Sequence, residues 1–568
     1  MKKNNKDDKI NKKRKILMEK NFGIGIEDFK KLVTLENVFY IDKTLFIKEI
    51  IDNSNQTILI TRPRRFGKTL NMSMLDYFFD INKTSKNLFK SFKIMKEENK
   101  YTSKLNSVPV ISLTFNGIKP NNLTDMKKEI QEIISMTYRK HSYLLDSDKL
   151  SEEDKKDLKT IIYNNIPKNY KYSLSNQIFV LSTFLNIHFN KKVIILLDEY
   201  DAPLLESYVH GYYEEAIVFF KSFIGKTFKS NSNLEKGVLT GVSRVSKESI
   251  FSEANNIQVF TLLDNKFSSS FGFTEEDILC VLEKYGMLDR FKDIKTWYDG
   301  YTFGETKELY NPWSTLNYLE TQEIGPYWVN TSSNSIIKMI FAKSSIDVKK
   351  KLEDLIQGKE VEVDIDLNTI IPNIEERENN IWGLFLQTGY LKPTKKMMYN
   401  RYKVKIPNLE IKILYEEIIK SWSPSYTNNS LKYLIEKDFK SFEEYFEALT
   451  IQMFSFLDVK INEDENFYHA FVLGMLVELK DVYTVLSNRE SGLGRYDICL
   501  EPFDKTKPSF IIEFKSCKNK SFKEAIKEAK EQIINKKYET DLKQKGYKDI
   551  TKMVIAFKGK EVKIKYFK

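Results

Sequence analysis

Residues Gln56–Thr69 read QTILITRPRRFGKT, an apolar β-branched segment followed by a short basic loop. The apolar half predicts a buried strand, and a helix-like stretch, Lys68–Asp80, follows the loop at once. Within the loop, Gly67 allows close approach of a phosphate, Lys68 reaches the β- and γ-phosphates of a nucleotide such as ATP, and Thr69 ligates Mg²⁺. The free N–H groups and the dipole at the N-terminus of the helix add to this cradle. The arrangement predicts a nucleotide site between a strand and a helix.

The loop departs from the Walker A pattern GxxxxGK[ST] at one position, because Arg62 stands where that pattern has its first glycine. Arg62, Arg64 and Arg65 crowd the loop. One interpretation is that they contact nucleotide, an acidic neighbouring domain or nucleic acid, and we count Arg62 and Arg65 among the nucleotide-binding candidates. The other is structural pairing with carboxylates such as Asp42 or Asp201, and the sequence does not separate the two.

A second motif, VIILLDE, is an apolar strand that ends in two acids, Asp198 and Glu199. It has the form of a Walker B strand, in which Asp198 holds Mg²⁺ and Glu199 polarises the attacking water. The alternative is a buried strand with solvated acids at its end, but the preceding FGKT loop favours the NTPase interpretation. Thr240 ends a further strand, where the sensor of an NTPase would lie. Arg244 follows it and either reaches a γ-phosphate or is a surface or domain-contact arginine.

Strands and helices alternate over the first half of the chain. Besides the strand of the phosphate loop, apolar runs predict strands at Val108–Phe115, Val193–Asp198, Lys236–Val242 and Ile257–Leu262. Helical patterns between them include Asn122–Tyr138 and Tyr213–Lys229. This alternation predicts an α/β fold with a parallel sheet over residues 21–273. Residues 1–20 form a Lys-rich tail that we expect to be disordered.

The pattern changes twice after residue 273. Thr274 followed by three acids predicts the start of a helix, and residues 274–450 are expected to be mostly helical. We interpret them as a lid or linker region with a small β element near Tyr402–Ile406. Residues 451–568 predict a C-terminal α/β domain with a helix at Phe467–Lys480, strands at Val482–Ser487, Arg495–Leu500 and Phe510–Phe514, and an amphipathic helix over residues 522–533.

This C-terminal domain carries a cluster of charged residues. Strand alternation places Glu513 and Lys515 on one face, and a hairpin with the preceding strand brings Asp497 beside them. Two carboxylates beside a lysine suit a hard cation such as Mg²⁺, which would polarise a scissile phosphate. Lys515 would stabilise or help to generate a hydroxide. The cluster therefore predicts metal-dependent hydrolysis of a phosphodiester.

Three further polar residues flank the cluster. Glu490 lies near the Gly-rich turn Ser491–Gly494 and is a candidate to add a ligand or orient water. Gln532, on the following helix, is a candidate to contact water on the metal or substrate. His469, on the preceding helix, is more typical of a core or surface position than of a functional one.

The overall composition is that of a globular protein. The chain has 568 residues, 41% of them hydrophobic and 30% charged, which excludes collagen, low-complexity and wholly disordered chains. It has 3 cysteines and none in a CxxC pair, so a disulfide scaffold and a cysteine zinc site are not expected. Its apolar runs are too short for a membrane span, and we expect a soluble, cytoplasmic protein. The net charge of +11 fits a nucleic-acid partner, or a coding bias toward Lys, Asn and Ile.

Several of these motifs together resemble a known family. GIGIEDF at residues 23–29, YIDKT at 40–44, RPRRFGKT and LLDEYDAP resemble the AAA-ATPase-like family of prokaryotic proteins. YHAF at 468–471, SGLGRYD at 491–497 and IEFK at 512–515 resemble the PD-(D/E)XK nuclease domain that usually accompanies it. The resemblance covers nearly all of the chain except the basic tail. The arginine in place of the first Walker glycine is part of what such proteins look like.

The resemblance implies a P-loop NTPase fold, a helical lid and a restriction-endonuclease-like core. It makes Asp497, Glu513 and Lys515 the nuclease triad. The chain departs from the superfamily at two positions. The helix that usually carries an acid has His469 instead, and the tyrosine expected four residues after Gln532 is replaced by Lys536, with Tyr538 two residues later.

Three functions follow as hypotheses. The first is an ATPase coupled to a Mg²⁺-dependent nuclease that acts on nucleic acid, with DNA favoured over RNA as the substrate. The second is a nucleotide-gated module that binds nucleic acid or protein without cleavage. The third is a signalling-type NTPase whose output is assembly into a homo-oligomer.

Overall fold

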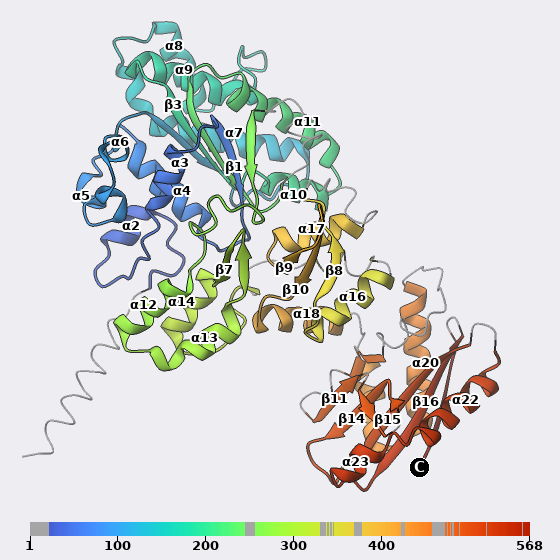
Figure 1. Ribbon diagram of the computed structural model, residues 1–568. Coiled ribbons are helices and arrows are strands. Elements are labelled where there is room, and N and C mark those ends of the chain that lie inside the picture. Colours follow the sequence, from blue (N-terminus) through green and yellow to red (C-terminus); the bar gives the residue numbers. More distant parts are fainter. Residues whose placement is uncertain are drawn as a thin grey trace, which may run out of the picture. The chain divides into compact units, whose positions relative to one another are not determined.

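The protein was analysed as a computed structural model (Figure 1). The structure describes residues 22–244, 256–329, 346–367, 378–421, 426–456, 482–487 and 489–568, except for 493, 518–519 and 559–560, together with a few isolated positions between residues 337 and 479. The basic tail, His469 and most of the helix predicted at Phe467–Lys480 lie outside the described residues. The chain divides into two compact units, residues 1–333 with 362–411, and residues 334–361 with 412–568.

The N-terminal unit is built on a parallel sheet of five strands in the order β2-β3-β4-β1-β5. The strands are β1 (Thr57–Thr61), β2 (Val110–Thr114), β3 (Val193–Asp198), β4 (Leu234–Gly241) and β5 (Ile257–Phe260). All residues of β1 and β3 are buried, as their uninterrupted apolar runs predict for a sheet covered on both faces. The predicted parallel α/β sheet is confirmed.

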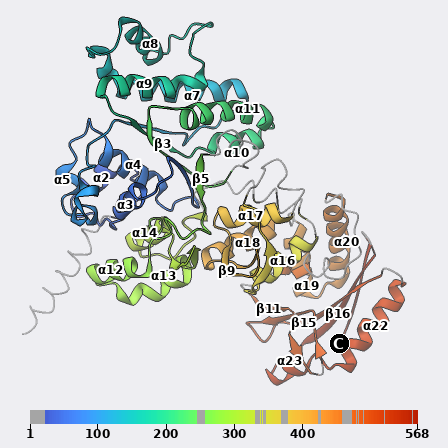
Figure 2. The same ribbon diagram turned by 45° about the horizontal axis from the view of Figure 1, so that its top comes forward.

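Helices cover both faces of this sheet. Helix α4 (Lys68–Phe79) lies on one face, and α7 (Leu123–Lys140), α9 (Gln177–Phe189) and α11 (Tyr213–Ile224) lie on the other (Figure 2). This division follows from right-handed crossovers, because β1 to β2 crosses the sheet in the direction opposite to β2–β3–β4. The carboxyl ends of β1, β3 and β4 therefore meet at one edge, next to the start of α4.

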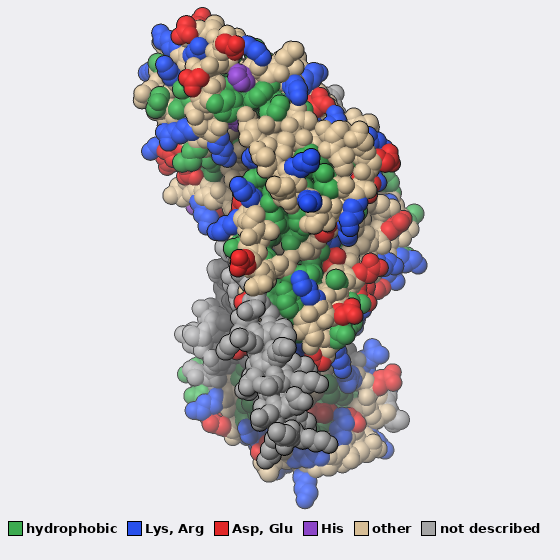
Figure 3. Space-filling view, turned by 90° about the vertical axis from the view of Figure 1, so that its left-hand side faces the viewer, with side chains coloured by type: hydrophobic (Ala, Val, Ile, Leu, Met, Phe, Trp, Pro, Cys, Tyr) green, Lys and Arg blue, Asp and Glu red, His purple; other side chains and the backbone are tan. Residues whose placement is uncertain are grey.

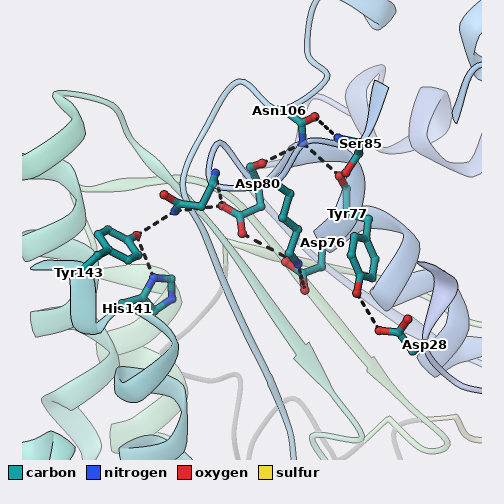
Figure 4. Close-up of polar contacts among 10 residues, drawn as sticks. Asp28, Asp76, Tyr77, Asp80, Ser85, Asn106, His141 and Tyr143 are labelled. Carbon is teal, nitrogen blue, oxygen red and sulfur yellow. Dashed lines mark hydrogen bonds and ion pairs between the residues drawn. The ribbon is translucent and has the colours of Figure 1, made fainter. Parts of the chain in front are cut away.

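A polar network fixes the far end of α4 (Figure 4). Asp80, the C-cap of α4, accepts from the backbone N–H of Asn82 at 3.0 Å. Asn106 donates to the Asp80 carbonyl at 2.9 Å, and Asn82 donates to the Tyr143 hydroxyl at 2.9 Å. The Tyr143 hydroxyl also lies 3.1 Å from Nδ1 of His141, whose pKa burial lowers to about 4. These contacts tie the helix of the phosphate loop to the layer beyond β2.

Residues 275–411 contain more β structure than the small element predicted near Tyr402–Ile406. Helices α12 (Glu275–Tyr285), α13 (Phe291–Tyr298) and α14 (Pro312–Thr321) are followed by α17 (Glu378–Gln387), and Thr274 caps α12 as predicted. Two small sheets accompany them, the hairpin of β6 (Tyr301–Phe303) and β7 (Thr306–Leu309), and a sheet of β8 (Val361–Asp364), β10 (Arg401–Lys405) and β9 (Lys392–Lys396). The β element expected near Tyr402–Ile406 is β10, whereas the other four short strands, β6 to β9, were not predicted.

The C-terminal unit has a mixed sheet in the order β11-β14-β15-β16-β17. Its strands are β11 (Tyr483–Ser487), β14 (Ile498–Pro502), β15 (Ser509–Ser516), β16 (Ile550–Lys558) and β17 (Glu561–Phe567), and only β15 and β16 pair in parallel. Helix α22 (Phe522–Asn535) packs on one face, while α19 (Tyr426–Glu436) and α20 (Phe439–Phe456) contribute to the core of the other (Figure 1). Among the described residues, no helix is long and apolar enough to cross a membrane.

Candidate functional sites

The loop between β1 and α4 has the backbone of a phosphate cradle. Gly67 is the N-cap of α4 with φ of 84°, and a Cβ built on it would meet no atom within 4 Å. The loop therefore leaves room next to the first N–H groups of the helix, where an anion is stabilised. Lys68 is buried, and its Nζ donates to the carbonyl of Pro63 at 3.0 Å. The ammonium group therefore lies inside the loop, at the position where the loop would surround a bound phosphate.

Asp198, at the end of β3, joins this loop to β4. One carboxylate oxygen accepts from the hydroxyl of Thr69 at 2.6 Å, and the other accepts from the hydroxyl of Thr240. The structure brings together Lys68, Thr69, Asp198 and Thr240, as predicted from the two motifs. Carboxylate and hydroxyl oxygens are ligands that suit Mg²⁺, so the donor set fits the cation of a Mg-nucleotide.

Glu199 and Lys68 influence one another across this edge. Burial raises the pKa of Glu199, and burial lowers the pKa of Lys68, although the nearby Glu199 acts in the opposite sense on the lysine. Glu199 has φ of 51°, an unusual value for a non-glycine residue. Such strained backbone occurs at sites where a side chain has to be held in a required direction. The position fits the predicted role of orienting water.

Two residues that the sequence did not single out for catalysis hold the loop after β4. Asp201 accepts from the backbone N–H groups of Val242 and Ser243 at 3.0 and 2.7 Å, and from the Ser243 hydroxyl at 2.8 Å. The Tyr200 hydroxyl donates to the Ser243 carbonyl at 2.9 Å. Arg244 follows directly. The acidic end of β3 therefore fixes the segment from which Arg244 projects.

Arg244 also contacts the region after the sheet, since its backbone N–H donates to Oε1 of Gln387 at 2.8 Å. Gln387 is the last residue of α17 and is itself buried. Its side-chain amide donates onward to the Leu367 carbonyl at 3.0 Å. The role of Arg244 at a γ-phosphate stays a prediction.

Arg62 is not a surface residue of the loop. Its side chain is fully buried, and its guanidinium donates to four backbone carbonyls, those of Thr61, Phe260, Lys266 and Phe267. The rings of Phe271 and Phe303 lie 5.4 and 5.1 Å away. This corrects the nucleotide contact predicted for Arg62: its donors are used in tying β1 to the end of β5.

Arg65 and Arg64 remain exposed on the loop. The Arg65 guanidinium lies over the ring of Trp313 at 4.3 Å and 3.9 Å from the carboxylate of Glu27. The Arg64 carbonyl accepts from the indole N–H of Trp328 at 3.1 Å. Residues well after the sheet, Trp313 and Trp328, thus pack against the phosphate loop. The nucleotide role of Arg65 stays a prediction.

In the C-terminal unit, the predicted triad comes together at the break between β13 (Gly494–Arg495) and β14. Asp497 precedes β14, and its carboxylate accepts from the backbone N–H of Phe514 at 2.8 Å. Glu513 is buried on β15, and its Oε1 lies 3.6 Å from Nζ of Lys515. The same carboxylate accepts from the side-chain amide of Gln532 on α22. The structure therefore brings Asp497, Glu513, Lys515 and Gln532 into one cluster.

Tyr538 follows Gln532 by six residues in the sequence and was not counted among the predicted site residues. Its hydroxyl accepts from Nε2 of Gln532 at 3.1 Å, although it lies beyond the end of α22 and not four residues after Gln532. The turn that carries it is held by the hairpin of β12 (Glu490–Ser491) and β13, because the Ser491 hydroxyl donates to the Tyr538 carbonyl at 2.7 Å. A tyrosine contact to this glutamine is therefore supplied from a different place in the sequence.

Glu490 is not brought into the cluster. Its side chain is 86% exposed, and its carboxylate lies 4.0 Å from the Arg495 guanidinium across the β12–β13 hairpin. The ligand role predicted for Glu490 is corrected by this placement, since the two-residue strand directs it toward solvent.

The donor set of the C-terminal cluster fits a hard cation. Within the described residues, no group of three or more His, Cys, Asp or Glu side chains is placed to hold a metal ion. The site therefore offers two carboxylates, Asp497 and Glu513, and leaves further positions to substrate and water. That arrangement is typical of Mg²⁺, which is bound through one or two carboxylates together with substrate phosphates.

Comparison with known families agrees with both sites. Residues 23–251 match the AAA-ATPase-like family, described as a predicted AAA-ATPase, and residues 463–567 match the PD-(D/E)XK nuclease superfamily. The chain joins an AAA-ATPase-like domain to a PD-(D/E)XK nuclease superfamily domain. The AAA-ATPase-like match contains the phosphate loop, Asp198 and Thr240, and the nuclease-superfamily match contains Asp497, Glu513, Lys515 and Gln532.

The chain is also similar to a curated protein over most of its length. The "uncharacterized protein in vnfD 5′ region" of Azotobacter chroococcum mcd 1 is 25% identical over 486 residues, which cover 82% of this chain and 85% of that protein. The similarity therefore spans most of both chains and not one domain alone.

Proposed function

We propose that the chain is an ATP-hydrolysing protein whose AAA-ATPase-like domain is coupled to a Mg²⁺-dependent nuclease domain that acts on DNA. The observation that carries this proposal is that each domain gathers a cluster of its own. One domain brings together Lys68, Thr69 and Asp198, and the other brings together Asp497, Glu513 and Lys515. A buried carboxylate beside a lysine is costly unless the pair has a role, and each site has such a carboxylate at the end of a buried strand.

At the nucleotide site, Lys68 would exchange the Pro63 carbonyl for the β- and γ-phosphates, because an anion is a stronger acceptor than a neutral carbonyl. Thr69 and Asp198 would hold Mg²⁺ between them. Glu199 would orient the attacking water, and its raised pKa favours its accepting a proton there. Arg244 would contribute charge at the γ-phosphate from the loop that Asp201 fixes.

At the nuclease site, Asp497 and Glu513 would hold Mg²⁺, which supplies positive charge to the scissile phosphate. Lys515, 3.6 Å from Glu513, would donate to the phosphate or to the hydroxide that attacks it. Gln532 orients the Glu513 carboxylate through its amide. The net charge of +11 favours an acidic polymer as the substrate.

The test uses the full chain as wild type, Lys68→Ala and Lys515→Ala. ATP turnover and cleavage of single- and double-stranded DNA and RNA are measured with and without Mg²⁺. We expect Lys515→Ala to turn over ATP without cutting, and Lys68→Ala to lose ATP turnover. Cleavage by Lys515→Ala at the wild-type rate would reject the nuclease assignment.

The same experiment separates the alternatives. Binding of DNA without cleavage, and no change on adding Mg²⁺ or Mn²⁺, would indicate a nucleotide-gated binding module. Growth of molecular mass with ATP in light scattering, in the absence of nucleic acid, would indicate an oligomerising NTPase. Assembly into a homo-oligomer stays a prediction.

A further inference from the structure

The hairpin formed by β9 and β10 is a strongly basic element of the N-terminal unit that neither site uses. Residues 391–409 contain six cations, Lys392, Lys395, Lys396, Arg401, Lys403 and Lys405, and no Asp or Glu. By contrast, Lys and Arg side chains are interspersed with Asp and Glu on the face of the molecule shown in Figure 3.

The register gathers four of these cations on one face. Lys403 pairs with Lys395, and Lys405 pairs with Lys392, with a register shift between Lys403 and Val404. Because Lys403 and Lys405 are two residues apart on the same strand, they share a face, and their cross-strand partners lie on it too. The extra residue is on β9, so the shift keeps both pairs on the same side.

Three of the six cations have no ion pair among the described residues. Arg401 is matched, because its guanidinium contacts Asp364 at 2.9 and 3.1 Å and Glu362 at 3.6 Å on β8. For Lys395, Lys403 and Lys405, no ion pair occurs in the part of the chain that the structure describes. Like charges held side by side on a sheet are destabilising, so a retained lysine face is expected to meet an acidic partner.

The tip of the hairpin adds an unusual apolar exposure. Met398 and Tyr399 are 70% and 87% exposed, and both lie in the short connection between the strands. On the strand below, the Lys396 ammonium lies 5.8 Å from the centre of the Tyr402 ring. A solvent-exposed aromatic ring beside a row of lysines is the combination on which unpaired bases stack while the backbone follows the charges.

The base of the hairpin is held firmly. A Cβ built on Gly389 would lie 2.9 Å from the side chain of Pro63 in the phosphate loop, and the Tyr390 ring packs 5.4 Å from that of Trp328. The β9 strand begins two residues later. A rigid base lowers the entropy that a protruding element loses on binding.

We propose that the β9–β10 hairpin binds a single-stranded segment of nucleic acid, with Lys395, Lys403 and Lys405 at successive phosphates and Tyr399 stacked on a base. The proposal rests on the proposed function in one respect, that the substrate is a nucleic acid. It assigns recognition of the strand to a surface separate from the residues that hydrolyse it. A protein with an acidic surface is the competing partner, and the absence of strand binding would leave that alternative.

The experiment measures the affinity of the full chain for a fluorescein-labelled single-stranded DNA by anisotropy, with EDTA present so that no cleavage occurs. The test variants are Lys395→Ala/Lys403→Ala and Tyr399→Ala. The matched control is Lys86→Ala/Lys90→Ala, which removes two exposed lysines elsewhere in the same unit. All the substituted side chains are at least partly exposed, and thermal unfolding verifies that each variant is folded.

We expect the hairpin double variant to weaken binding and to lower the slope of log K against log salt by about 1.4, since each phosphate contact on a single strand contributes about 0.7. Tyr399→Ala is expected to weaken single-strand binding roughly tenfold, and Tyr399→Phe to restore it. Tyr399→Ala is expected to weaken binding of a fully paired duplex by less than it weakens binding of the single strand. The lysine control should bind as wild type does.

Equal affinity and equal salt slope for wild type and the hairpin double variant would overturn the proposal. Equal losses on single strand and duplex in Tyr399→Ala would overturn its single-strand part. The result for the nuclease site is separate, because the anisotropy assay contains EDTA and reports binding without cleavage. A wild-type chain that binds through the hairpin but never cleaves would reject the proposed nuclease activity and retain the hairpin site.

Discussion

Asp198 and Glu513 are equally buried carboxylates on equally buried strands, yet the protein satisfies them in different ways. Both oxygens of Asp198 accept from hydroxyls, those of Thr69 and Thr240, while the nearby cation Lys68 is held on a backbone carbonyl. Glu513 faces a cation directly, with Lys515 at 3.6 Å, and an amide from Gln532. The first site keeps its positive and negative groups apart, so that a phosphate can enter between them. The second holds its charges together, with Lys515 beside Glu513, an arrangement that fits the proposed hydrolysis of a phosphodiester.

The largest expected effects come from substituting the two carboxylates, since each substitution acts on the chemistry of its own domain. Glu513→Gln should reduce DNA cleavage by at least about a hundredfold, because it removes a charge that a bound cation needs, and should leave ATP turnover unchanged. Asp198→Asn should lower ATP turnover, and any loss of cleavage that accompanies it measures the coupling between the two domains. Steady-state ATP hydrolysis and gel-based cleavage measure the two, with the exposed Glu531→Gln on α22 as the control.

If Glu513→Gln and Asp198→Asn each lowered both activities to the same extent, the two sites would have to act as one. That result would contradict the assignment of separate chemistry to the two domains. Loss of both activities in Asp198→Asn, with ATP turnover intact in Glu513→Gln, would instead indicate that the nucleotide site gates cleavage.

A third buried carboxyl, Glu410, extends the comparison of Asp198 with Glu513, because its hydrogen-bond donors among the described residues are neutral groups. It accepts from the Trp328 backbone N–H at 2.6 Å and from the Ser314 hydroxyl at 2.8 Å, and burial raises its pKa to about 7. A carboxyl with a raised pKa stabilises the fold below its unfolded pKa, near 4.5, and this contribution is lost as the pH rises through 7.

The expected loss is about 3 kcal/mol in the free energy of unfolding between pH 4 and pH 8. Denaturant unfolding of wild type and Glu410→Gln across this range measures it as the difference between the two pH profiles. The exposed Glu283→Gln is the matched control. Parallel profiles for wild type and Glu410→Gln would show that the pKa of Glu410 is the same in the folded and unfolded states, and would contradict this prediction.

Two glycines at the sites are expected to differ in what they tolerate. Both have positive φ, but a Cβ on Gly492 would lie 2.4 Å from the carbonyls of Lys536 and Lys537, whereas Gly67 has open space. Gly492→Ala should lower stability by about 1–3 kcal/mol and reduce cleavage, because it displaces the turn that carries Tyr538. Gly67→Ala should cost about 1–2 kcal/mol of backbone strain and act on ATP binding.

Thermal unfolding and the two activity assays distinguish these outcomes. A Gly492→Ala protein with wild-type cleavage would mean that the β12–β13 hairpin does not position the turn. Equal loss of ATP binding in both variants would contradict the separation of the sites.

The sequence was sufficient for those parts of the fold whose residues are locally apolar. Strands β1–β5 were predicted within a few residues, because TILIT and VIILLD cannot be solvated along their length. Strands β9 and β10, KPTKK and RYKVK, were not fully predicted, since their pairing and not their hydrophobicity makes them strands. Strands β16 and β17 were missed as well, although β16 is buried along most of its length and is the parallel partner of β15.

The candidate sites were predictable where spacing along one element fixes the geometry. Glu513 and Lys515 share a face because they are two residues apart on a strand, and Lys68 and Thr69 follow from one loop. Arg62 was misplaced because the carbonyls that hold it include those of Phe260 and Phe267, about two hundred residues away. The loop-fixing role of Asp201 was missed for the same reason, since its partners lie after β4.

The smallest effect concerns Tyr538, which the sequence did not place. Its hydroxyl accepts from Gln532, and Gln532 donates to Glu513, so the tyrosine acts on the nuclease carboxylate through one intermediary. Tyr538→Phe keeps the ring in the core, where it packs 6.3 Å from Tyr496, and removes only the hydroxyl. The loss of one neutral hydrogen bond is worth about 1 kcal/mol, so cleavage should fall roughly fivefold with stability nearly unchanged.

A double-mutant cycle tests whether this effect passes through the glutamine. With Gln532 replaced by alanine, Tyr538→Phe should cause no further loss of cleavage, because the intermediary is gone. Additive losses would mean that the tyrosine contacts substrate itself and belongs among the catalytic residues. In both cases Tyr538 takes the place of a tyrosine one helical turn after Gln532. The end of α22 and the β12–β13 hairpin together hold its hydroxyl against the Gln532 amide.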